Sequence, residues 1–397
     1  MGEFSLEEVV KTIYVLKRDF SFKTVILFML GLLYKFICYF LYCLRTPWFI
    51  LSRRFFCRDL KPVNKVLIVR KDNFGDLIIT LKSTYLFKKI NPNIELSIVC
   101  NEEFVNFIEK TCLFKKIYRY EKSLRLLKKI KADKYDTILI ISPISFILNF
   151  LSFILKIPNR IGYNKMNSGL FLTAPVEFGY FPFGRKKPYC ETVLDIFKKI
   201  SKGELSLPEK IGATDLFLKN VVIDSKKNFL KQIFMDENFQ KIIISKGSKT
   251  NPDTKLSNKR WMNLVRNLLK NKQNIVVIVG SKKEIIENKI FYGYKRIYNL
   301  TGKTNLIDLL YMLEHSDLLF STDTGLNHLA SLFPHVRKIN FFGPSDPKIW
   351  GYLHDDTYQT LQTNIPCAPC SYPKNIRHLI CKKNYCMSKK FLNIDKF

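Results

Sequence analysis

The chain has 397 residues, of which 47% are hydrophobic, so it is long enough for two domains with separate cores and is not an intrinsically disordered protein. Its 65 lysine and arginine residues against 34 aspartate and glutamate residues give a formal net charge of +31. This excess indicates polyanionic surroundings, and nucleic acid, anionic membrane lipid and phosphorylated glycolipid would all satisfy it.

The first 60 residues differ in character from the rest of the chain. Val25 to Leu44 is a run of twenty residues, almost all apolar or aromatic, that is interrupted by Lys35. As a helix it would span about 30 Å of hydrocarbon, but a central lysine costs about 2.5–3.5 kcal/mol and basic residues flank both ends. We therefore predict that residues 1–60 form a helical extension attached to the cytoplasmic face of a membrane, with Trp48, Phe49, Phe55 and Phe56 at the headgroup level. A helical hairpin packed on the protein's own core is the alternative.

The region after residue 60 alternates β-branched runs with segments of helical periodicity. Strands are expected at 65–70, 94–100, 116–120 and 137–142, and helices at 75–90, 104–110, 123–131 and 191–200. Such alternation predicts a parallel sheet with helices on both faces. The apolar run 144–155 is expected to be a covered crossover helix, and 158–188 a polar zone with glycines and prolines.

A second alternating set follows a break after Ser201. Strands are expected at 241–245, 275–279, 296–300, 317–321 and 337–342, and helices at 261–269, 282–291 and 306–315. The chain is therefore expected to hold two Rossmann-like doubly wound α/β domains, 61–201 and 241–366, joined by a linker region at 202–240 and followed by a cysteine-rich segment at 367–397.

The segment Ser321 to Trp350 combines three chemical features in one strand, helix and strand unit. Asp323, Thr324 and Gly325 stand where the helix begins, so a side chain caps the helix and free N–H groups point outward toward a phosphate. His328 lies one turn later on the same side. The second strand ends in the rigid turn Gly343-Pro344-Ser345-Asp346-Pro347, at the edge of the sheet where open α/β sheets bind ligands.

This unit resembles the C-terminal signature of the glycosyltransferase family 9 heptosyltransferases, which build the inner core of lipopolysaccharide. Residues 65–77, KVLIVRKDNFGDL, resemble the opening strand and glycine-aspartate loop of that family, and 245–261 carries Gly247-Ser248 and Lys259-Arg260-Trp261 in the family's order. The resemblance covers residues 61–390 and implies a GT-B fold, in which two Rossmann-like domains face a cleft. Tyr352 departs from the family pattern, in which proline is common at this position.

Moving a sugar from a nucleoside diphosphate to a hydroxyl needs a base for the hydroxyl and positive charge for the departing diphosphate. Asp76 suits the first task, because it follows Gly75 in the loop after the first expected strand, and Asp72 is the alternative in the same loop. In the family that this chain resembles, the aspartate matching Asp76 is the proposed general base. An aspartate that merely interacts with a helix dipole explains Asp76 equally well from the residue alone.

Lys259 and the N–H groups at Thr324 and Gly325 form a candidate clamp for the diphosphate, with Arg260 as the competitor of Lys259. No metal or other cofactor is then required, and the Asp-x-Asp spacing of metal-dependent sugar transferases is absent from the sequence. The resemblance implies further donor contacts. They are Ser248 with phosphate, Lys259 with phosphate or sugar, Glu284 with the ribose, Thr304 beside the adenine, and Asp323 and His328 at the sugar-diphosphate.

Four cysteines cluster near the C-terminus with the spacing C-x2-C-x10-C-x4-C. They are Cys367, Cys370, Cys381 and Cys386. This spacing fits a structural zinc ion, while paired thiols and a disulfide are the alternatives.

Together these features predict a metal-independent, inverting glycosyltransferase that moves heptose from ADP-heptose to a phosphorylated acceptor of the lipopolysaccharide core, in the cytoplasm at the inner-membrane surface and without a nucleic-acid partner. The same chemistry with another nucleotide sugar and another surface glycan is the first alternative. The second is a basic protein that binds nucleic acid or anionic lipid without catalysis.

Overall fold

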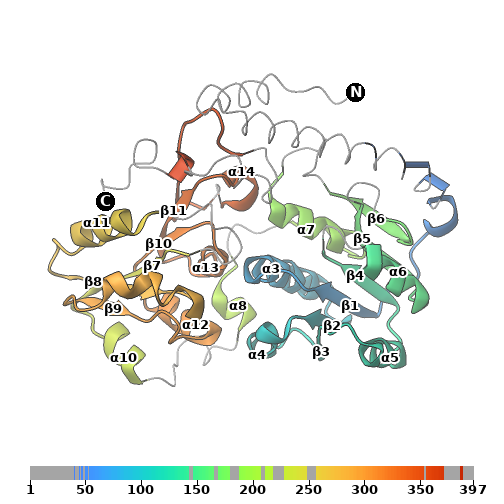
Figure 1. The fold of residues 1–397 in the computed structure, drawn as a ribbon. Coiled ribbons are helices and arrows are strands. Elements are labelled where there is room, and N and C mark those ends of the chain that lie inside the picture. Colours follow the sequence, from blue (N-terminus) through green and yellow to red (C-terminus); the bar gives the residue numbers. More distant parts are fainter. Residues whose placement is uncertain are drawn as a thin grey trace. The chain divides into compact units, whose positions relative to one another are not determined.

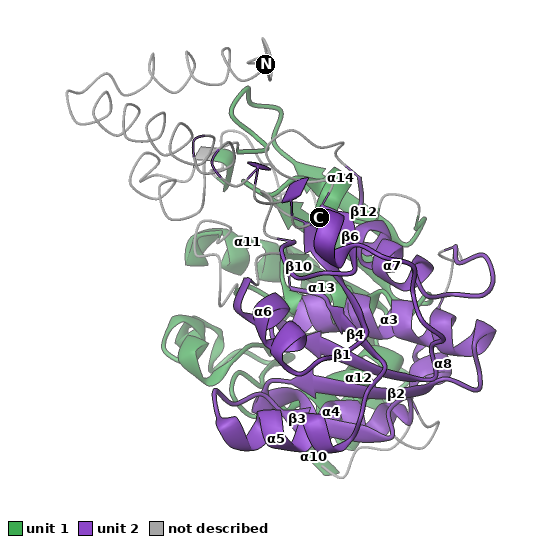
Figure 2. Ribbon diagram, turned by 90° about the vertical axis from the view of Figure 1, so that its right-hand side faces the viewer, with its two compact units in different colours: residues 1–35, 219–397 green, residues 36–218 purple. Residues whose placement is uncertain are grey.

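The computed structural model describes residues 53–142, 146–164, 169–178, 187–206, 211–217, 228–247, 256–352, 355–370 and 385–387, with isolated positions between 40 and 51. The apolar run Val25 to Leu44 lies almost wholly outside these residues. Within them, no helix combines the length and the apolar character needed to cross a membrane. The described residues fall into two compact units, unit 2 at 36–218 and unit 1 from 219 onward (Figure 2).

Unit 2 is built on a six-stranded parallel sheet with the order β3-β2-β1-β4-β5-β6. The strands are β1 (Lys65–Arg70), β2 (Glu95–Cys100), β3 (Lys116–Arg119), β4 (Thr137–Ile140), β5 (Asn159–Asn164) and β6 (Ala174–Glu177). The helices are α3 (Phe74–Ile90), α4 (Val105–Ile108), α5 (Leu124–Ala132), α6 (Phe146–Ile154), α7 (Tyr189–Lys198) and α8 (Ala213–Leu216).

The sheet of unit 2 is buried between two layers of helices. Helices α5 and α6 lie on one face and α3 and α7 on the other (Figure 1). Leu67 and Ile138 pack with Leu126 of α5 on the first face. On the second face, Phe87 of α3 contacts Phe197 of α7 with ring centroids 5.6 Å apart. The predicted parallel sheet with helices on both faces is therefore confirmed.

Two strands lie where the sequence analysis expected only a polar zone. Strand β5 is buried along its whole length although it contains Asn159 and Arg160. The polar groups are satisfied, because the Asn159 side chain donates to the carbonyl of Lys61 and to the hydroxyl of Thr137, both at 3.0 Å. The sequence analysis predicted no strand in this polar zone, and the structure shows that hydrogen bonds allow polar side chains to be buried in one.

Helix α6 also differs from its prediction as a covered crossover helix. Its most buried side chains are the polar Asn149 and Ser152, at 2% and 1% exposure. By contrast Ile147 is 70% exposed and Ile154 53% exposed. The apolar side of α6 therefore faces outward, and the prediction that it is covered was wrong.

Unit 1 repeats the architecture with the strand order β12-β11-β10-β7-β8-β9, again with every neighbouring pair parallel. The strands are β7 (Gln240–Ser245), β8 (Asn274–Val279), β9 (Ile297–Asn299), β10 (Leu318–Thr322), β11 (Arg337–Phe342) and β12 (Tyr358–Gln362). The helices are α10 (Asn228–Phe234), α11 (Asn258–Leu268), α12 (Leu306–Glu314), α13 (Gly325–Ala330) and α14 (Pro347–Trp350). Strand β12 and the short α14 were not predicted.

The boundary between the units falls between Leu218 and Lys219. It lies inside the region 202–240 for which the sequence analysis predicts a linker. That region also contains two helices, α8 in unit 2 and α10 after the boundary.

Trp261 of α11 lies at the centre of the core of unit 1. It is fully buried, and its ring contacts Phe341 of β11 at 5.7 Å. We expect Trp261→Ala to lower the free energy of unfolding by about 3–5 kcal/mol, because the substitution leaves a cavity in a packed core. Urea titration followed by circular dichroism measures this change. Leu124→Ala, at a residue that is 75% exposed, is the control, and an equal effect of both substitutions would contradict the packing.

Candidate active site

The order of strands places a candidate site at the carboxyl edge of the sheet in unit 2. Strand β1 pairs with β2 on one side and with β4 on the other. The connections leave in opposite directions there, which makes the β1–β4 edge the position where open α/β sheets bind ligands. The loop with Asp72 follows β1 and leads into the first turn of α3, which contains Asp76, and Ser142 follows β4. The hydroxyl of Ser142 donates to Asp72 Oδ2 at 2.9 Å across this edge.

Arg70, the last residue of β1, organises these groups. Its side chain is 1% exposed and reaches both carboxylates, with Nη1 3.4 Å from Asp72 Oδ2 and Nη2 3.0 Å from Asp76 Oδ1. Nη1 also donates to the carbonyl oxygen of Ile141, and Nη2 donates to the hydroxyl of Tyr189 at 2.9 Å. One buried guanidinium therefore connects the ends of β1 and β4 with the first residue of α7.

Charge and burial distinguish the two aspartates. One guanidinium faces two carboxylates, so the cluster carries a net negative charge when both are ionised. Burial raises the pKa of the Asp72 carboxyl above its usual value, and the opposing attraction of Arg70 does not cancel this effect. The Asp76 side chain is 17% exposed and that of Asp72 is 28% exposed, so both carboxylates are partly accessible to a substrate.

Asp76 also takes part in the start of helix α3. Its Oδ2 accepts from the backbone N–H of Asn73 at 3.3 Å, and the N–H of Leu77 donates to the Asn73 carbonyl at 3.1 Å. The helix-terminal interpretation of Asp76 is thus present in the structure, and it is compatible with a chemical role, because the same contact orients the carboxylate. The sequence analysis missed Arg70. A charged residue at the end of an otherwise apolar strand was the available signal.

In unit 1 the corresponding edge lies between β7 and β10, which pair directly. All strands of this sheet are parallel, so the segments that follow them emerge at one edge. The predicted donor residues all come from such segments. Gly247 follows β7, Glu284 follows β8, Thr304 follows β9, and Asp323, Thr324, Gly325 and His328 follow β10. Ser248 lies outside the described residues.

Glu284 lies directly over the glycines that follow β7 and β8. A Cβ atom on Gly247 would come within 1.6 Å of Glu284 Oε1, and one on Gly280 within 3.2 Å of its carboxyl carbon. Glu284 Oε2 accepts from both the backbone N–H and the hydroxyl of Ser281 at 2.8 Å. The carboxylate is therefore fixed beside Gly247 and Gly280. Thr304 is half-buried in the turn before α12.

The β10–α13 turn contains buried polar atoms that make no hydrogen bond in the described structure. They are Thr322 Oγ1, Thr324 Oγ1 and both side-chain polar atoms of Asn327. Thr324 occupies the N-cap position of α13, but its side chain does not cap the helix as the sequence predicts. Buried groups of this kind cost free energy unless a partner satisfies them. These atoms are therefore available to a polar ligand.

His328 is 6% exposed and is positioned by two tyrosines. Its Nδ1 lies 3.0 Å from the hydroxyl of Tyr352, which stacks on Tyr358 with ring centroids 4.9 Å apart. The Tyr358 hydroxyl donates at 2.5 Å to the carbonyl of Asn327, in α13 itself. Tyr352, which departs from the family pattern, thus orients the imidazole, and the sequence analysis had assigned it no role.

The structure separates Lys259 from its competitor. Lys259 is exposed in the first turn of α11. Arg260 is 7% exposed, and its Nη1 donates at 2.5 Å to the carbonyl oxygen of Met387. Arg260 therefore fixes the C-terminal segment to unit 1, which leaves Lys259 as the cation accessible to a ligand.

The C-terminal cysteine cluster is only partly described. A Cβ atom on Gly343 would meet Met387 Sδ at 2.6 Å, and the N–H of Cys370 donates to the Pro344 carbonyl at 2.9 Å. The cysteine-rich segment thus packs on the turn that follows β11. Among the described residues no group of three or more His, Cys, Asp or Glu side chains is arranged to hold a metal ion. Cys381 lies outside them, so the zinc site stays a prediction.

Arg70 provides a test of the carboxylate cluster. We expect Arg70→Met to lower the free energy of unfolding by about 3–5 kcal/mol, because buried carboxylates lose their counter-charge. Arg119→Met is the matched control. Its ion pair with Glu102, at 3.0 Å, is exposed on both sides, and such pairs contribute about 0.2–1 kcal/mol. Chemical denaturation measures both variants, and equal losses would show that Arg70 does not organise the cluster.

Comparison with known proteins shows the family and the fold of the chain. The sequence profile of glycosyltransferase family 9 (heptosyltransferase) matches residues 123–379. A Haemophilus influenzae protein that bears the provisional name of a glycosyltransferase is 22% identical over 322 residues, which cover 74% of this chain and 87% of that protein.

Two solved structures share the fold. Escherichia coli ADP-heptose LPS heptosyltransferase II is 16% identical, with a TM-score of 0.60, over 75% of this chain and 90% of its own. E. coli heptosyltransferase WaaC with ADP is also 16% identical, with a TM-score of 0.57, over 75% of this chain and 92% of its own. The predicted α/β fold class of two Rossmann-like units is confirmed. Because the profile covers more than half of the sequence, the chain belongs to glycosyltransferase family 9 and is a glycosyltransferase.

Proposed function

We propose that this protein transfers a heptose from ADP-heptose to a hydroxyl of a phosphorylated lipopolysaccharide-core acceptor, with inversion at the anomeric carbon. The observation that carries the proposal is the Asp76 carboxylate, held by Arg70 at the β1–β4 edge of a family 9 chain. The E. coli relatives act on ADP-heptose or bind ADP, which supports the choice of donor. The alternative of a binding protein without catalysis does not fit a member of this family.

In the proposed reaction Asp76 accepts the proton of the acceptor hydroxyl. Its Oδ1 is engaged with Arg70 at 3.0 Å, whereas the contact of Oδ2 among the described residues is the longer one to the Asn73 N–H at 3.3 Å. Oδ2 is therefore the oxygen that takes the proton. The acceptor oxygen then attacks the anomeric carbon from the face opposite the diphosphate, the bond to the diphosphate oxygen breaks, and ADP leaves. Arg70 and Asp72 keep Asp76 oriented throughout, with Arg70 as the positioning residue.

The departing ADP is proposed to bind at the carboxyl edge of unit 1. Thr322 and Thr324 supply hydroxyl groups and Asn327 supplies an amide, and all three have buried polar atoms without partners in the described structure. His328, held by Tyr352, donates to the sugar-diphosphate, and Asp323 binds a sugar hydroxyl. Glu284 binds the ribose and Thr304 lies beside the adenine. Lys259 and Ser248 complete the phosphate contacts.

This donor site stabilises the leaving diphosphate with an ammonium group and neutral donors. We therefore propose that transfer requires no metal ion and no other cofactor. The acceptor is lipid-linked, so the protein is proposed to work in the cytoplasm at the inner-membrane surface, attached peripherally and without a nucleic-acid partner. Another nucleotide sugar for a different surface glycan would use the same arrangement of residues and is the alternative.

The first test concerns the base. Asp76→Asn should reduce turnover by about 100-fold or more, since a positioned general base contributes about 10²–10⁴ in rate, while ADP-heptose binding stays unchanged. Asp133→Asn is the matched control, because Asp133 also carries an ion pair, with Lys116, but follows α5, away from the carboxyl edge. Mass detection of the product on a deacylated core acceptor measures turnover. If Asp76→Asn keeps wild-type turnover, Asp76 is not the base.

The second test concerns the metal. We expect EDTA to leave transfer unchanged, because protein cations and hydrogen-bond donors neutralise the diphosphate. In a separate measurement by calorimetry, Lys259→Ala and Asp323→Ala should each weaken the binding of ADP-heptose. Loss of transfer in EDTA that magnesium restores would refute the metal-free mechanism.

A further inference from the structure

The outward face of helix α6 is an apolar surface on unit 2. Five of its side chains fall on one stripe and are between 37% and 70% exposed, namely Phe146, Ile147, Phe150, Phe153 and Ile154. The opposite side of the helix is buried and polar, and there Ser152 donates to the Asn149 carbonyl one turn earlier in the same helix at 2.6 Å. Exposed apolar stripes of this size cost free energy in water and mark surfaces that bind a partner.

The stripe continues onto two other segments of the chain. Phe171, from the loop before β6, contacts Phe146, Phe150 and Phe153 with ring centroids 5.3–5.8 Å apart. Phe56 contacts Phe153 at 5.3 Å and Phe171 at 5.4 Å. We call these five phenylalanines, with Ile147 and Ile154, the aromatic face. Because Phe56 belongs to it, the aromatic face adjoins the point where the N-terminal extension enters unit 2.

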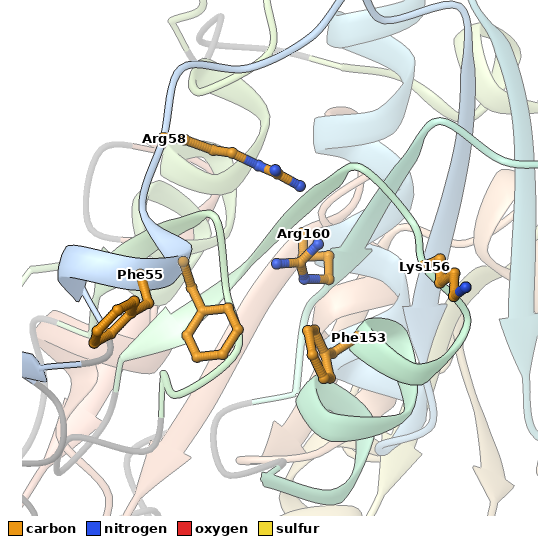
Figure 3. A pocket seen from close by; sticks show the side chains of 6 residues that line it. Phe55, Arg58, Phe153, Lys156 and Arg160 are labelled. Carbon is orange, nitrogen blue, oxygen red and sulfur yellow. The ribbon is translucent and has the colours of Figure 1, made fainter.

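A basic pocket of about 290 Å³ opens beside the aromatic face (Figure 3). Its cations are Arg58, Lys156 and Arg160, and its walls include Phe55, Phe56 and Phe153. In Figure 3 the guanidinium groups of Arg58 and Arg160 point toward the same space. Within the described part of the chain, none of the three cations forms an ion pair with a carboxylate.

Arg160 is the most unusual member of the pocket. It is 3% exposed, and its Nε and Nη1 donate to the carbonyl oxygens of Phe171 at 2.6 Å and Ile157 at 2.7 Å. Burial and the neighbouring Arg58 lower the pKa of Arg160 to about 10. A buried cation that faces another cation is stabilised when an anion binds between them. The pocket is therefore suited to a phosphate group.

Two residues near the pocket have strained backbone conformations, which also indicates a binding site. Phe171 and Lys156 both adopt left-handed conformations, with φ of 71° and 57°. Non-glycine residues in this region cost about 1–3 kcal/mol and gather at binding sites. In this conformation the Phe171 ring contacts the phenylalanines of α6, and the Phe171 carbonyl accepts a hydrogen bond from Arg160.

We propose that this surface docks unit 2 on an anionic phospholipid bilayer, with a lipid phosphate between Arg58 and Arg160 and the aromatic face in the acyl boundary. The inference rests on the proposed work at the membrane. It extends the attachment predicted for residues 1–60, which include Phe55, Phe56 and Arg58, to α6, Phe171 and Arg160 of the folded unit 2. The occupant is argued from complementarity, because one surface offers apolar side chains next to cations, as a headgroup and its chains require. Phe55, 71% exposed, extends the apolar area toward the extension.

Other occupants fit this surface less well. A second copy in a two-fold contact would place Arg58, Lys156 and Arg160 near their own equivalents, which is repulsive. A nucleic acid would satisfy the cations but leave the isoleucines in water. The extension carries the apolar run that is itself expected at a membrane, so both surfaces would reach the same bilayer.

The test uses the full chain and sedimentation with vesicles of phosphatidylcholine, with or without phosphatidylglycerol. We expect binding to the anionic vesicles. Ile147→Asp combined with Ile154→Asp should weaken it at least about tenfold, because two charges enter the acyl boundary. Ile286→Asp is the matched control, since Ile286 is 78% exposed but belongs to unit 1, and its binding should equal that of the wild type. Unchanged binding of the double variant would overturn the proposal.

Two further measurements identify the occupant. Arg58→Glu combined with Lys156→Glu should weaken binding to anionic vesicles. Millimolar inorganic phosphate should not release the wild-type protein from these vesicles. Hydrogen exchange on vesicles should protect 146–156. If exchange is slowed only in residues before Arg53, the lipid is not the occupant of this surface. The same holds if α6 is protected in a dimer that forms without vesicles. Transfer to a soluble acceptor fragment should stay unchanged in these variants. The vesicle assay therefore tests the docking surface, and the soluble-acceptor assay tests the proposed reaction.

Discussion

One buried guanidinium organises the edge of unit 2 where chemistry is proposed. Arg70 contacts Asp72 and Asp76 with different nitrogens and also reaches a carbonyl after β4 and the hydroxyl of Tyr189. A lysine ammonium could not make this set of contacts, because they diverge from a planar fork. The position of Asp76 therefore depends on β1, β4 and α7 together. A base that must stay oriented benefits from such a rigid frame, since its orientation is settled before the substrate binds.

The two units present different kinds of side chain at the carboxyl edges of their sheets. In unit 2 a cation gathers two carboxylates at the β1–β4 edge, which suits the acceptance of a proton. In unit 1 the β7–β10 edge offers neutral groups, since the side-chain polar atoms of Thr322, Thr324 and Asn327 make no hydrogen bond within the described part of the chain, and Glu284 lies over Gly247. Such neutral donors, together with the exposed Lys259, suit an anion that must bind and later leave.

The alternation of strands and helices could be predicted because apolar β-branched runs, such as Val66–Val69, mark buried parallel strands. The positions of Asp76 and of Asp323 to His328 after their strands followed from that pattern. Arg70 could not be predicted, since its role depends on β4 and α7, far away in sequence. Strand β5 was missed because Asn159 and Arg160 are satisfied by partners from other segments, the carbonyls of Lys61 and Phe171. Tyr352 was noticed as a departure, but only its contact with His328 gives it a role.

Helix α6 shows why hydrophobicity alone misleads. Its apolar sequence predicted burial, yet the fold buries Asn149 and Ser152 and leaves the isoleucines outside. Turning the helix by half a turn would cover the apolar side chains but would remove the rings that contact Phe171, and with them the wall of the basic pocket. Leaving these side chains in water costs free energy, and exposed apolar patches of this kind mark surfaces that bind a membrane or another protein. Under the proposed function, in which the acceptor is lipid-linked, a bilayer would cover the apolar side of α6 and would hold unit 2 where the acceptor lies.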